Sequence, residues 1–262
     1  MSNKKPIIFI GAGNVATHLA KSFFSKGLSI SKVYSKNIEN ARLLAQAINA
    51  KPCNSLDNLY EQNHIYFVCV KDDVIEEVIS QLSIQNNLVV HTSGSVNIDV
   101  FVNKNINNYG IFYPLQTFSK DKTVNISEVP FCIEGNNSAT ENELVDLAKC
   151  LSNNLQLINS EQRKHLHLAA VFACNFSNYM YAIADDLLQQ NNLDLNLLKP
   201  LITETANKIK DNPPKAMQTG PAKRNDQEVI KKQLEMLANK PEYKELYQLI
   251  TNNIIKTTNG KF

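Results

Sequence analysis

The chain has 262 residues, of which 43% are hydrophobic and 20% charged, and its formal net charge is +2. This length allows one large domain or two modest ones with a substantial core, and the composition excludes a disordered, collagen-like or coiled-coil protein. The 27 Lys and Arg residues against 25 Asp and Glu residues leave no excess positive charge for a phosphate backbone, so we expect no nucleic-acid partner.

Short strand-like runs and stretches with helical spacing alternate through the first half of the chain. Strands are expected at residues 7–10, 31–35, 65–70 and 88–91, and helices at residues 16–25, 41–48 and 74–82. Residues 65–70 are continuously apolar, as a strand covered on both faces must be. This alternation predicts an α/β protein whose N-terminal part is a doubly wound, Rossmann-type parallel sheet.

The pattern changes after Gly110. A proline-containing segment at 111–118 precedes a strand at 130–134 and a helix at about 140–151. Residues 161–190 contain no glycine or proline, which predicts one long, largely buried helix; three more helices are expected at 196–209, 226–237 and 242–255. We therefore expect a Rossmann-like domain at residues 1–155 and an all-α domain at residues 156–262.

The five cysteines are odd in number and lack C-x-x-C spacing, which is typical of neither a disulfide framework nor a zinc site. We therefore expect a reducing, cytoplasmic environment and no metal site. The apolar run after Lys4 and Lys5 is too short for a signal peptide, and no segment reaches the length of a membrane span. We expect neither export nor a membrane partner.

Residues 11–16 read Gly-Ala-Gly-Asn-Val-Ala, the G-x-G-x-x-A form of the dinucleotide-binding fingerprint, between the first strand and the first helix. Gly11 permits the tight turn, Gly13 lets a pyrophosphate approach the backbone, and Ala16 lets helix and strand pack closely. The free N–H groups and positive dipole end of the helix would face the phosphates. The alternative is a glycine turn without a ligand, which the surrounding β-α-β unit disfavours.

The end of the second strand indicates which nicotinamide cofactor is bound. An acid there binds a ribose 2′-hydroxyl, whereas cationic or hydroxyl groups accommodate a 2′-phosphate. Ser35 and Lys36 follow the strand, and the first acid is Glu39. NADP(H) is therefore the predicted cofactor, the alternative being that Lys36 is only a solvated loop charge.

Polar turns at residues 70–73 and 91–95 follow the next two strands. Ligands of open α/β sheets lie beyond the carboxyl ends of the strands, so both turns are expected to line the cofactor crevice. Ser93 and Ser95 could instead serve as helix caps or turn residues, and His91 is expected to be a hydrogen-bonded structural histidine. The predicted cofactor contacts are Gly11, Gly13, Asn14, Val15, Ala16, Ser35, Lys36, Val70, Lys71, Thr92 and Ser93.

Several longer motifs carry a resemblance over nearly the whole chain. They are the fingerprint, Val-Lys-Asp-Asp-Val-Ile at 70–75, His-Thr-Ser-Gly-Ser at 91–95, Gly-Ile-Phe-Tyr-Pro-Leu-Gln-Thr-Phe at 110–118, the segment 167–176, and Thr-Gly-Pro-Ala-Lys-Arg-Asn-Asp at 219–226. Together they resemble a family of Rossmann-type oxidoreductases whose C-terminal half is a domain of unknown function. Its distant relatives are pyrroline-5-carboxylate reductase, ketopantoate reductase and the β-hydroxyacid dehydrogenases.

The resemblance implies an N-terminal NADP-binding domain and a helical C-terminal domain that pairs two subunits, but it implies no particular substrate. Where the family is expected to have Phe-His-Pro, this chain has Phe112, Tyr113 and Pro114. An acid/base role at that position would therefore fall to Tyr113 or be absent. A more distant resemblance to deazaflavin-dependent NADP reductases adds a deazaflavin as a possible co-substrate.

Polar residues lie along one face of the long, otherwise apolar helix predicted for residues 161–190. At about 100° per residue, Lys164, His167, Asn175 and Asn178 lie within about 80° of one another. The alternatives are that the histidine is a structural residue with all its hydrogen bonds made inside the protein and that the lysine is exposed to solvent. Buried amides and imidazoles, however, need hydrogen-bond partners, and a substrate can supply them. Related dehydrogenases use Lys and Asn from the corresponding helix. We expect His167 to donate a proton, Lys164 to offset developing charge and Asn175 to orient the substrate.

The loop at residues 219–226 offers one further cation. Arg224 could hold a substrate carboxylate bidentately or form a salt bridge, and Asp226 is expected to cap the next helix. The predicted substrate contacts are Ser93, Tyr113 and Arg224.

These observations predict an NADP-dependent reductase or dehydrogenase that transfers a hydride between the nicotinamide and a small carbonyl, imine or hydroxy-acid substrate. The alternative is a non-catalytic NADP-binding sensor or interaction protein, which the tyrosine at position 113 keeps open. Residues 161–190 are too apolar on too many faces to be covered by the remaining C-terminal residues. A homodimer formed through the C-terminal helices is therefore expected.

Overall fold

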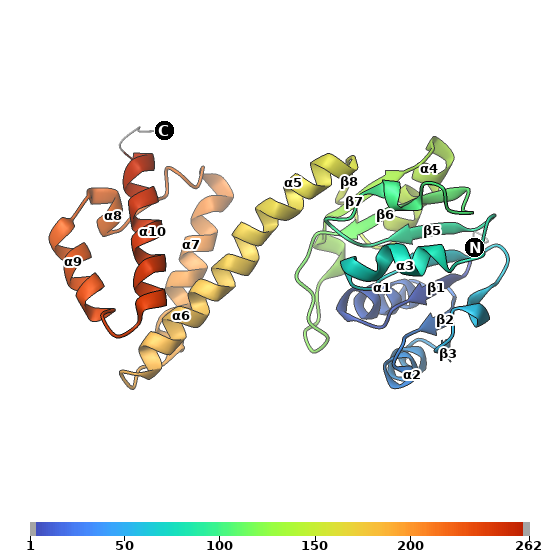
Figure 1. The fold of residues 1–262 in the computed structure, drawn as a ribbon, viewed down its shortest axis with the longest axis horizontal. Coiled ribbons are helices and arrows are strands. Elements are labelled where there is room, and N and C mark those ends of the chain that lie inside the picture. Colours follow the sequence, from blue (N-terminus) through green and yellow to red (C-terminus); the bar gives the residue numbers. More distant parts are fainter. Residues whose placement is uncertain (1–3, 259–262) are drawn as a thin grey trace. The chain divides into compact units, whose positions relative to one another are not determined.

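The computed structural model describes residues 4–258, and the chain divides into two compact units, Met1–Cys174 and Asn175–Phe262. An eight-stranded sheet forms the centre of the N-terminal unit (Figure 1). Its strands are β1 (Ile7–Ile10), β2 (Ile30–Tyr34), β3 (Lys51–Cys53), β4 (Ile65–Val68), β5 (Leu88–His91), β6 (Asn108–Pro114), β7 (Phe131–Gly135) and β8 (Leu155–Leu157).

The strands lie in the order β3-β2-β1-β4-β5-β6-β7-β8. All neighbouring pairs are parallel except β6 and β7. The chain builds outward from β1 to β3 and then returns to place β4 on the other side of β1, so the strand order reverses between β1 and β4. The predicted fold class, a Rossmann-type sheet followed by helices, is confirmed, with one antiparallel pair that the sequence pattern did not indicate.

Five α-helices accompany the sheet in residues 4–174, the described part of the N-terminal unit. They are α1 (Asn14–Ser25), α2 (Ile38–Ala47), α3 (Ile75–Ser80), α4 (Ser138–Ala148) and α5 (Ser160–Ala170). Asparagine side chains begin three of these helices: Asn37, Asn137 and Asn159 accept hydrogen bonds from backbone N–H groups of the first turns of α2, α4 and α5. These caps explain why α2 begins before the apolar spacing that predicted it.

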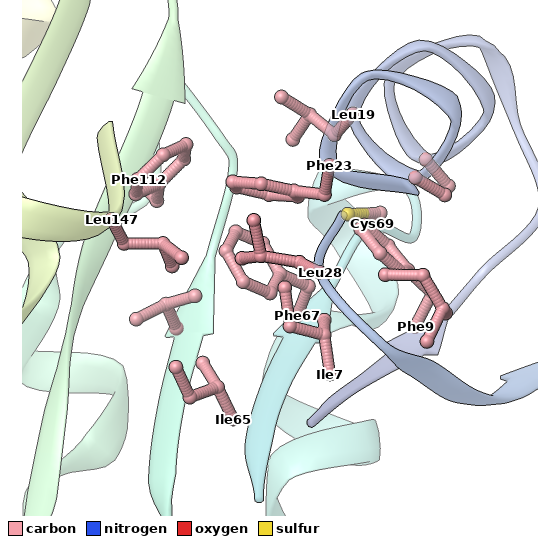
Figure 2. Packing of buried hydrophobic residues seen from close by; sticks show 14 of the residues in the cluster. Ile7, Phe9, Leu19, Phe23, Leu28, Ile65, Phe67, Cys69, Phe112 and Leu147 are labelled. Atoms are coloured by element: carbon pink, nitrogen blue, oxygen red, sulfur yellow. The ribbon is translucent and has the colours of Figure 1, made fainter. Parts of the chain in front are cut away.

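Each central strand sends alternate side chains to opposite faces of the sheet, as a doubly covered sheet requires. In β1, Ile7 and Phe9 belong to a core cluster shared with α1, α2 and α4, whereas Ile8 and Ile10 belong to a second cluster shared with α3. Phe67 of β4 lies at the centre of the first cluster, with its ring centroid 5.2 Å from that of Phe9 (Figure 2). All of these side chains are fully buried.

Three strands were not predicted as such. Strands β3 and β8 have three residues each at the two edges of the sheet, and β3 contains Pro52, which an edge strand tolerates. The segment predicted at 111–118 is β6, which ends at Pro114. The change from Rossmann-like to helical organisation was predicted after residue 155, which is the first residue of β8. The N-terminal unit of the structure extends further along the chain and includes both β8 and α5.

The C-terminal unit is all-α in the part of it that the structure describes. Its helices are α6 (Ser177–Gln189), α7 (Lys199–Asp211), α8 (Pro221–Arg224), α9 (Gln227–Met236) and α10 (Pro241–Thr258). Helices α8 and α9 pack against α10, and apolar side chains of α6, α8, α9 and α10 line a cavity of about 410 Å³. Between residues 4 and 258, no helix combines the length and apolar character that crossing a membrane requires.

Helical structure runs from Ser160 to Gln189, as predicted for residues 161–190, but the segment is neither α-helical throughout nor largely buried. Residues Val171–Phe176 form a π-helix between α5 and α6, and α6 has no buried residue. Large apolar side chains are exposed along the segment instead, with Phe172 63% and Tyr179 53% exposed. Because a π-turn takes more residues than an α-turn, a calculation at about 100° per residue does not extend across this segment.

Candidate active site

The turn after β1 has the backbone geometry of a phosphate-binding loop. Gly11 has a φ of +119°, and a Cβ there would lie 2.3 Å from the carbonyl oxygen of Cys69. Only glycine avoids this clash with backbone. At Gly13, by contrast, a Cβ would meet no atom within 4 Å, so the space beside that residue is open.

Helix α1 begins directly after this turn without a side-chain cap. Gly13 is its N-cap residue, and its first turn contains no acidic residue. The N–H groups and the positive dipole end of α1 are therefore available to an anion. Ala16 is fully buried in the core, while the side-chain amide of Asn14 donates a hydrogen bond to the carbonyl oxygen of Phe118 at 2.8 Å.

The turns after β1, β4 and β5 lie side by side at one edge of the sheet. Backbone hydrogen bonds join Cys69 to Ile10 (2.7 Å) and Thr92 to Val68 (3.3 Å) at the ends of these strands. Lys71 is exposed beyond β4, Val70 is half-buried, and Thr92 and Ser93 are buried. Open α/β sheets bind ligands at the carboxyl ends of the strands, at the point where the strand order reverses.

No carboxylate stands at the end of β2. Ser35 and Lys36 follow the strand directly, with Ser35 half-buried and Lys36 exposed. Glu39 lies in the first turn of α2 and forms an ion pair with Arg42 of the same helix. Between residues 4 and 258, Lys36 forms no ion pair, so its ammonium group can meet a ligand phosphate.

The hydroxyl of Ser93 serves the turn that contains it. Its Oγ accepts hydrogen bonds from the backbone N–H groups of Ser95 (3.1 Å) and Val96 (3.0 Å). The N–H of Ser93 in turn donates to Nδ1 of His91 at 3.2 Å. His91 is fully buried, and burial lowers its pKa to about 3, so it is a neutral structural histidine as predicted. Ser93 therefore lies at the carboxyl end of β5, where a ligand is expected, but its hydroxyl is already hydrogen-bonded within the turn.

Tyr113 and His167 meet beside this turn. The hydroxyl of Tyr113 lies 2.9 Å from Nδ1 of His167, and the two rings are arranged edge to face. Tyr113 is 8% exposed, and burial raises its pKa to about 12. A Cβ at Gly94 would lie 2.5 Å from Nδ1 of His167 and 2.9 Å from Cζ of Tyr113. The sequence identified Tyr113 and His167 separately but gave no sign that Gly94 packs against both.

A buried ionic network holds the start of α5, and our sequence analysis assigned no role to its central residue. Arg163 is fully buried and pairs with Glu134 of β7 at 2.5 Å. It also donates hydrogen bonds to Ser160 and to the carbonyl oxygen of Val96. Ser160 Oγ donates to Glu134 (2.7 Å) and accepts from the N–H of Ile98 (3.0 Å). The network therefore fixes α5, which carries His167, against β7 and the loop after β5.

Three other residues, Lys164, Asn175 and Arg224, were also predicted for chemistry. Lys164 is half-buried and forms an ion pair with Glu161 at 2.8 Å. Asn175 and Arg224 are both exposed residues of the C-terminal unit, and the π-helix removes the basis for placing Asn175 on the face of His167. Asp226 caps α9 by accepting from the N–H of Val229 at 3.2 Å, which confirms the capping interpretation.

The glycine turn and the reversal of strand order define a Rossmann-type nucleotide-binding protein with an added helical unit. Residues 6–94 match the family model "NADP oxidoreductase coenzyme F420-dependent", and residues 129–254 match "Domain of unknown function (DUF2520)". A "putative NADP oxidoreductase" from Bacteroides fragilis is 42% identical, with a TM-score of 0.90, over 97% of this chain and 98% of that one. The chain belongs to this family of Rossmann-type oxidoreductases, as predicted. No curated protein matches it.

Two solved structures share the fold at lower identity. An imine reductase from Myxococcus stipitatus in complex with NADP+ is 13% identical, with a TM-score of 0.65, over 97% of this chain and 93% of that one. A pyrroline carboxylate reductase from Plasmodium falciparum with NADP bound is 14% identical, with a TM-score of 0.59, over 98% of this chain and 99% of that one. The fold is therefore one that NADP-binding reductases use. Within residues 4–258 no cluster of His, Cys, Asp or Glu is arranged to hold a metal ion.

Proposed function

We propose that the protein is an NADP-dependent oxidoreductase that acts on a small carbonyl, imine or hydroxy-acid substrate. The observation that carries this proposal is the open, glycine-lined turn at the uncapped start of α1, at the point where strand order reverses. The similar structures that contain NADP use the same fold. Residues Gly11, Gly13, Asn14, Val15 and Ala16 would hold the pyrophosphate.

The end of β2 supports NADP(H) over NAD(H). Ser35 and the unpaired ammonium group of Lys36 can receive a 2′-phosphate, and the nearest acid on α2 is engaged by Arg42. The turns of β4 and β5, with Val70, Lys71, Thr92 and Ser93, would line the rest of the crevice. Bound NADPH would supply the hydride, and the chain must then bind the substrate and provide a proton.

His167 is the proposed proton donor. Its Nδ1 is occupied by Tyr113, whereas Nε2 has no hydrogen-bond partner among the described residues and is available to a substrate. An imidazole can exchange a proton near neutral pH, which suits reduction of a carbonyl or imine. Lys164 of the same helix would offset developing charge once released from Glu161.

A screen of NADPH oxidation tests the proposal directly. Small 2-oxo acids, cyclic imines and aldehydes are offered to the full chain, and the absorbance of the reduced cofactor is followed. We expect turnover with at least one class and a loss of about 10²- to 10⁴-fold for His167→Ala without a matching loss of cofactor affinity. Tight NADPH binding without turnover in any class would favour the non-catalytic sensor, and turnover only with a deazaflavin would identify that group as co-substrate.

The exposed apolar side chains of residues 168–181 support a homodimer. Leu168, Phe172, Phe176 and Tyr179 are each about half exposed or more, which is unusual for a single chain in water. Pairing of these segments in two chains would cover them. Light scattering at micromolar concentrations tests this, and a mass of 29.4 kDa would exclude the dimer.

A further inference from the structure

Tyr113 is close enough to His167 to control which of its nitrogens carries the proton. Building on the proposed function, in which His167 meets the substrate through Nε2, we propose that Tyr113 is a positioning residue whose hydroxyl donates a hydrogen bond to Nδ1 of His167. This bond would fix the proton of the neutral imidazole on Nε2. This N–H would then point away from Tyr113, toward the substrate, where it can donate a hydrogen bond to the oxygen or nitrogen atom on which negative charge develops.

The direction of the hydrogen bond follows from the number of acceptors. If Nδ1 carried the proton and donated to Tyr113, the hydroxyl proton of Tyr113 would need a second acceptor. Among the described residues that hydroxyl forms no hydrogen bond other than the one to Nδ1 of His167. Leaving a nearly buried hydroxyl proton without an acceptor is costly, so the tyrosine donates and the histidine accepts.

The surroundings hold both rings in this arrangement. Gly94 leaves no room between its Cα and the two side chains, since even a Cβ would overlap both. The start of α5 is fixed by the pairing of Arg163 with Glu134 and by a capping box in which Asn159 and Gln162 bond each other's backbone. A histidine held from both sides keeps one orientation, which is what a positioned acid needs.

Tyr113 itself is a poor source of the proton. Burial is the main cause of its raised pKa of about 12. Cys132, Asp72 and Cys174 act in the same direction, and Arg163 acts in the opposite direction. The hydroxyl therefore keeps its proton near neutral pH, so its contribution is orientation of His167 rather than transfer of its own proton.

Nitrogen NMR of the full chain with ¹⁵N-labelled histidine tests the inference without any substrate. The chain has five histidines, and His167→Asn identifies the resonances of His167 by their disappearance. At a pH where His167 is neutral, we expect a single tautomer with the proton on Nε2. In Tyr113→Phe, which removes only the hydroxyl, both tautomers should be populated. A proton on Nδ1 in the unmodified protein, or identical tautomer populations in Tyr113→Phe, would overturn the inference.

A matched control separates this effect from general disturbance of β6. Tyr109 lies on the same strand, stacks on Phe101 and makes no contact with His167. Tyr109→Phe should leave the His167 resonances unchanged; a shift equal to that of Tyr113→Phe would show that the effect is not specific.

Activity distinguishes this inference from the proposed function. If a substrate class is turned over, Tyr113→Phe should slow it by about 10- to 100-fold with little change in NADPH affinity, and an unchanged rate would refute the positioning role. If no class is turned over while His167 still holds its proton on Nε2 through Tyr113, the oxidoreductase proposal fails and the tautomer assignment stands.

Discussion

Replacing Arg163 by methionine should strongly destabilise the N-terminal unit. Methionine has a similar length but cannot pair with Glu134, whose side chain is only 15% exposed, and it also removes the hydrogen bonds to Ser160 and to the carbonyl of Val96. Removing one partner of a buried ion pair leaves the other charge uncompensated and costs about 3–5 kcal/mol. For a unit of this size, that corresponds to a fall in melting temperature of about 6–20 °C.

The assay is urea unfolding followed by circular dichroism, with calorimetry to resolve the transition of the N-terminal unit. Arg42→Met is the matched control, because Arg42 and Glu39 form an ion pair whose side chains are 60% and 64% exposed. Exposed pairs contribute about 0–1 kcal/mol, so this variant should be nearly as stable as the unmodified protein. Equal, small losses for both variants would refute the view that the Arg163 network stabilises the fold.

Three further predictions concern Gly11, the cap of α9 and His91. Gly11→Ala should abolish NADPH binding in calorimetric titration and lower stability, because the new Cβ would overlap the carbonyl of Cys69; retained affinity would contradict this. Asp226→Ala should cost about 1 kcal/mol through loss of the α9 cap, and a change below about 0.3 kcal/mol would argue against that role. Stability should fall by about 3 kcal/mol between pH 6.5 and 4, because only the unfolded state protonates His91 when its folded pKa is about 3; His91→Asn should flatten this dependence.

The sequence predicted the elements whose physical signals are local. Continuous apolar runs identified β1, β4 and β5, and the turn after β1 was recognised by its glycines, of which Gly11 is needed by the backbone itself. Strands β3 and β8 gave no such signal, because three-residue edge strands bury little and are defined by pairing with distant segments. The antiparallel pairing of β6 with β7 is likewise a tertiary property.

The candidate site shows the same division. His167 and Tyr113 were identified, but their contact joins residues 54 positions apart and cannot be deduced from spacing. Arg163 was overlooked because a buried arginine resembles a surface one in sequence until its partner on β7 is known. The prediction that Asn175 lies on the same helix face as His167 assumed uninterrupted α-helical geometry. The π-helix at Val171–Phe176 does not have that geometry, so the prediction loses its basis.

The dissociation constants of NADPH and NADH, measured by calorimetric titration of the full chain, test the central claim most directly. We expect NADPH to bind at least about tenfold more tightly, a difference of about 1.4 kcal/mol. Lys36→Glu should remove this preference, whereas Lys26→Glu, at the opposite end of α1 from the glycine turn, should retain it. Equal or tighter binding of NADH by the unmodified protein would contradict the assignment of a 2′-phosphate site at the end of β2.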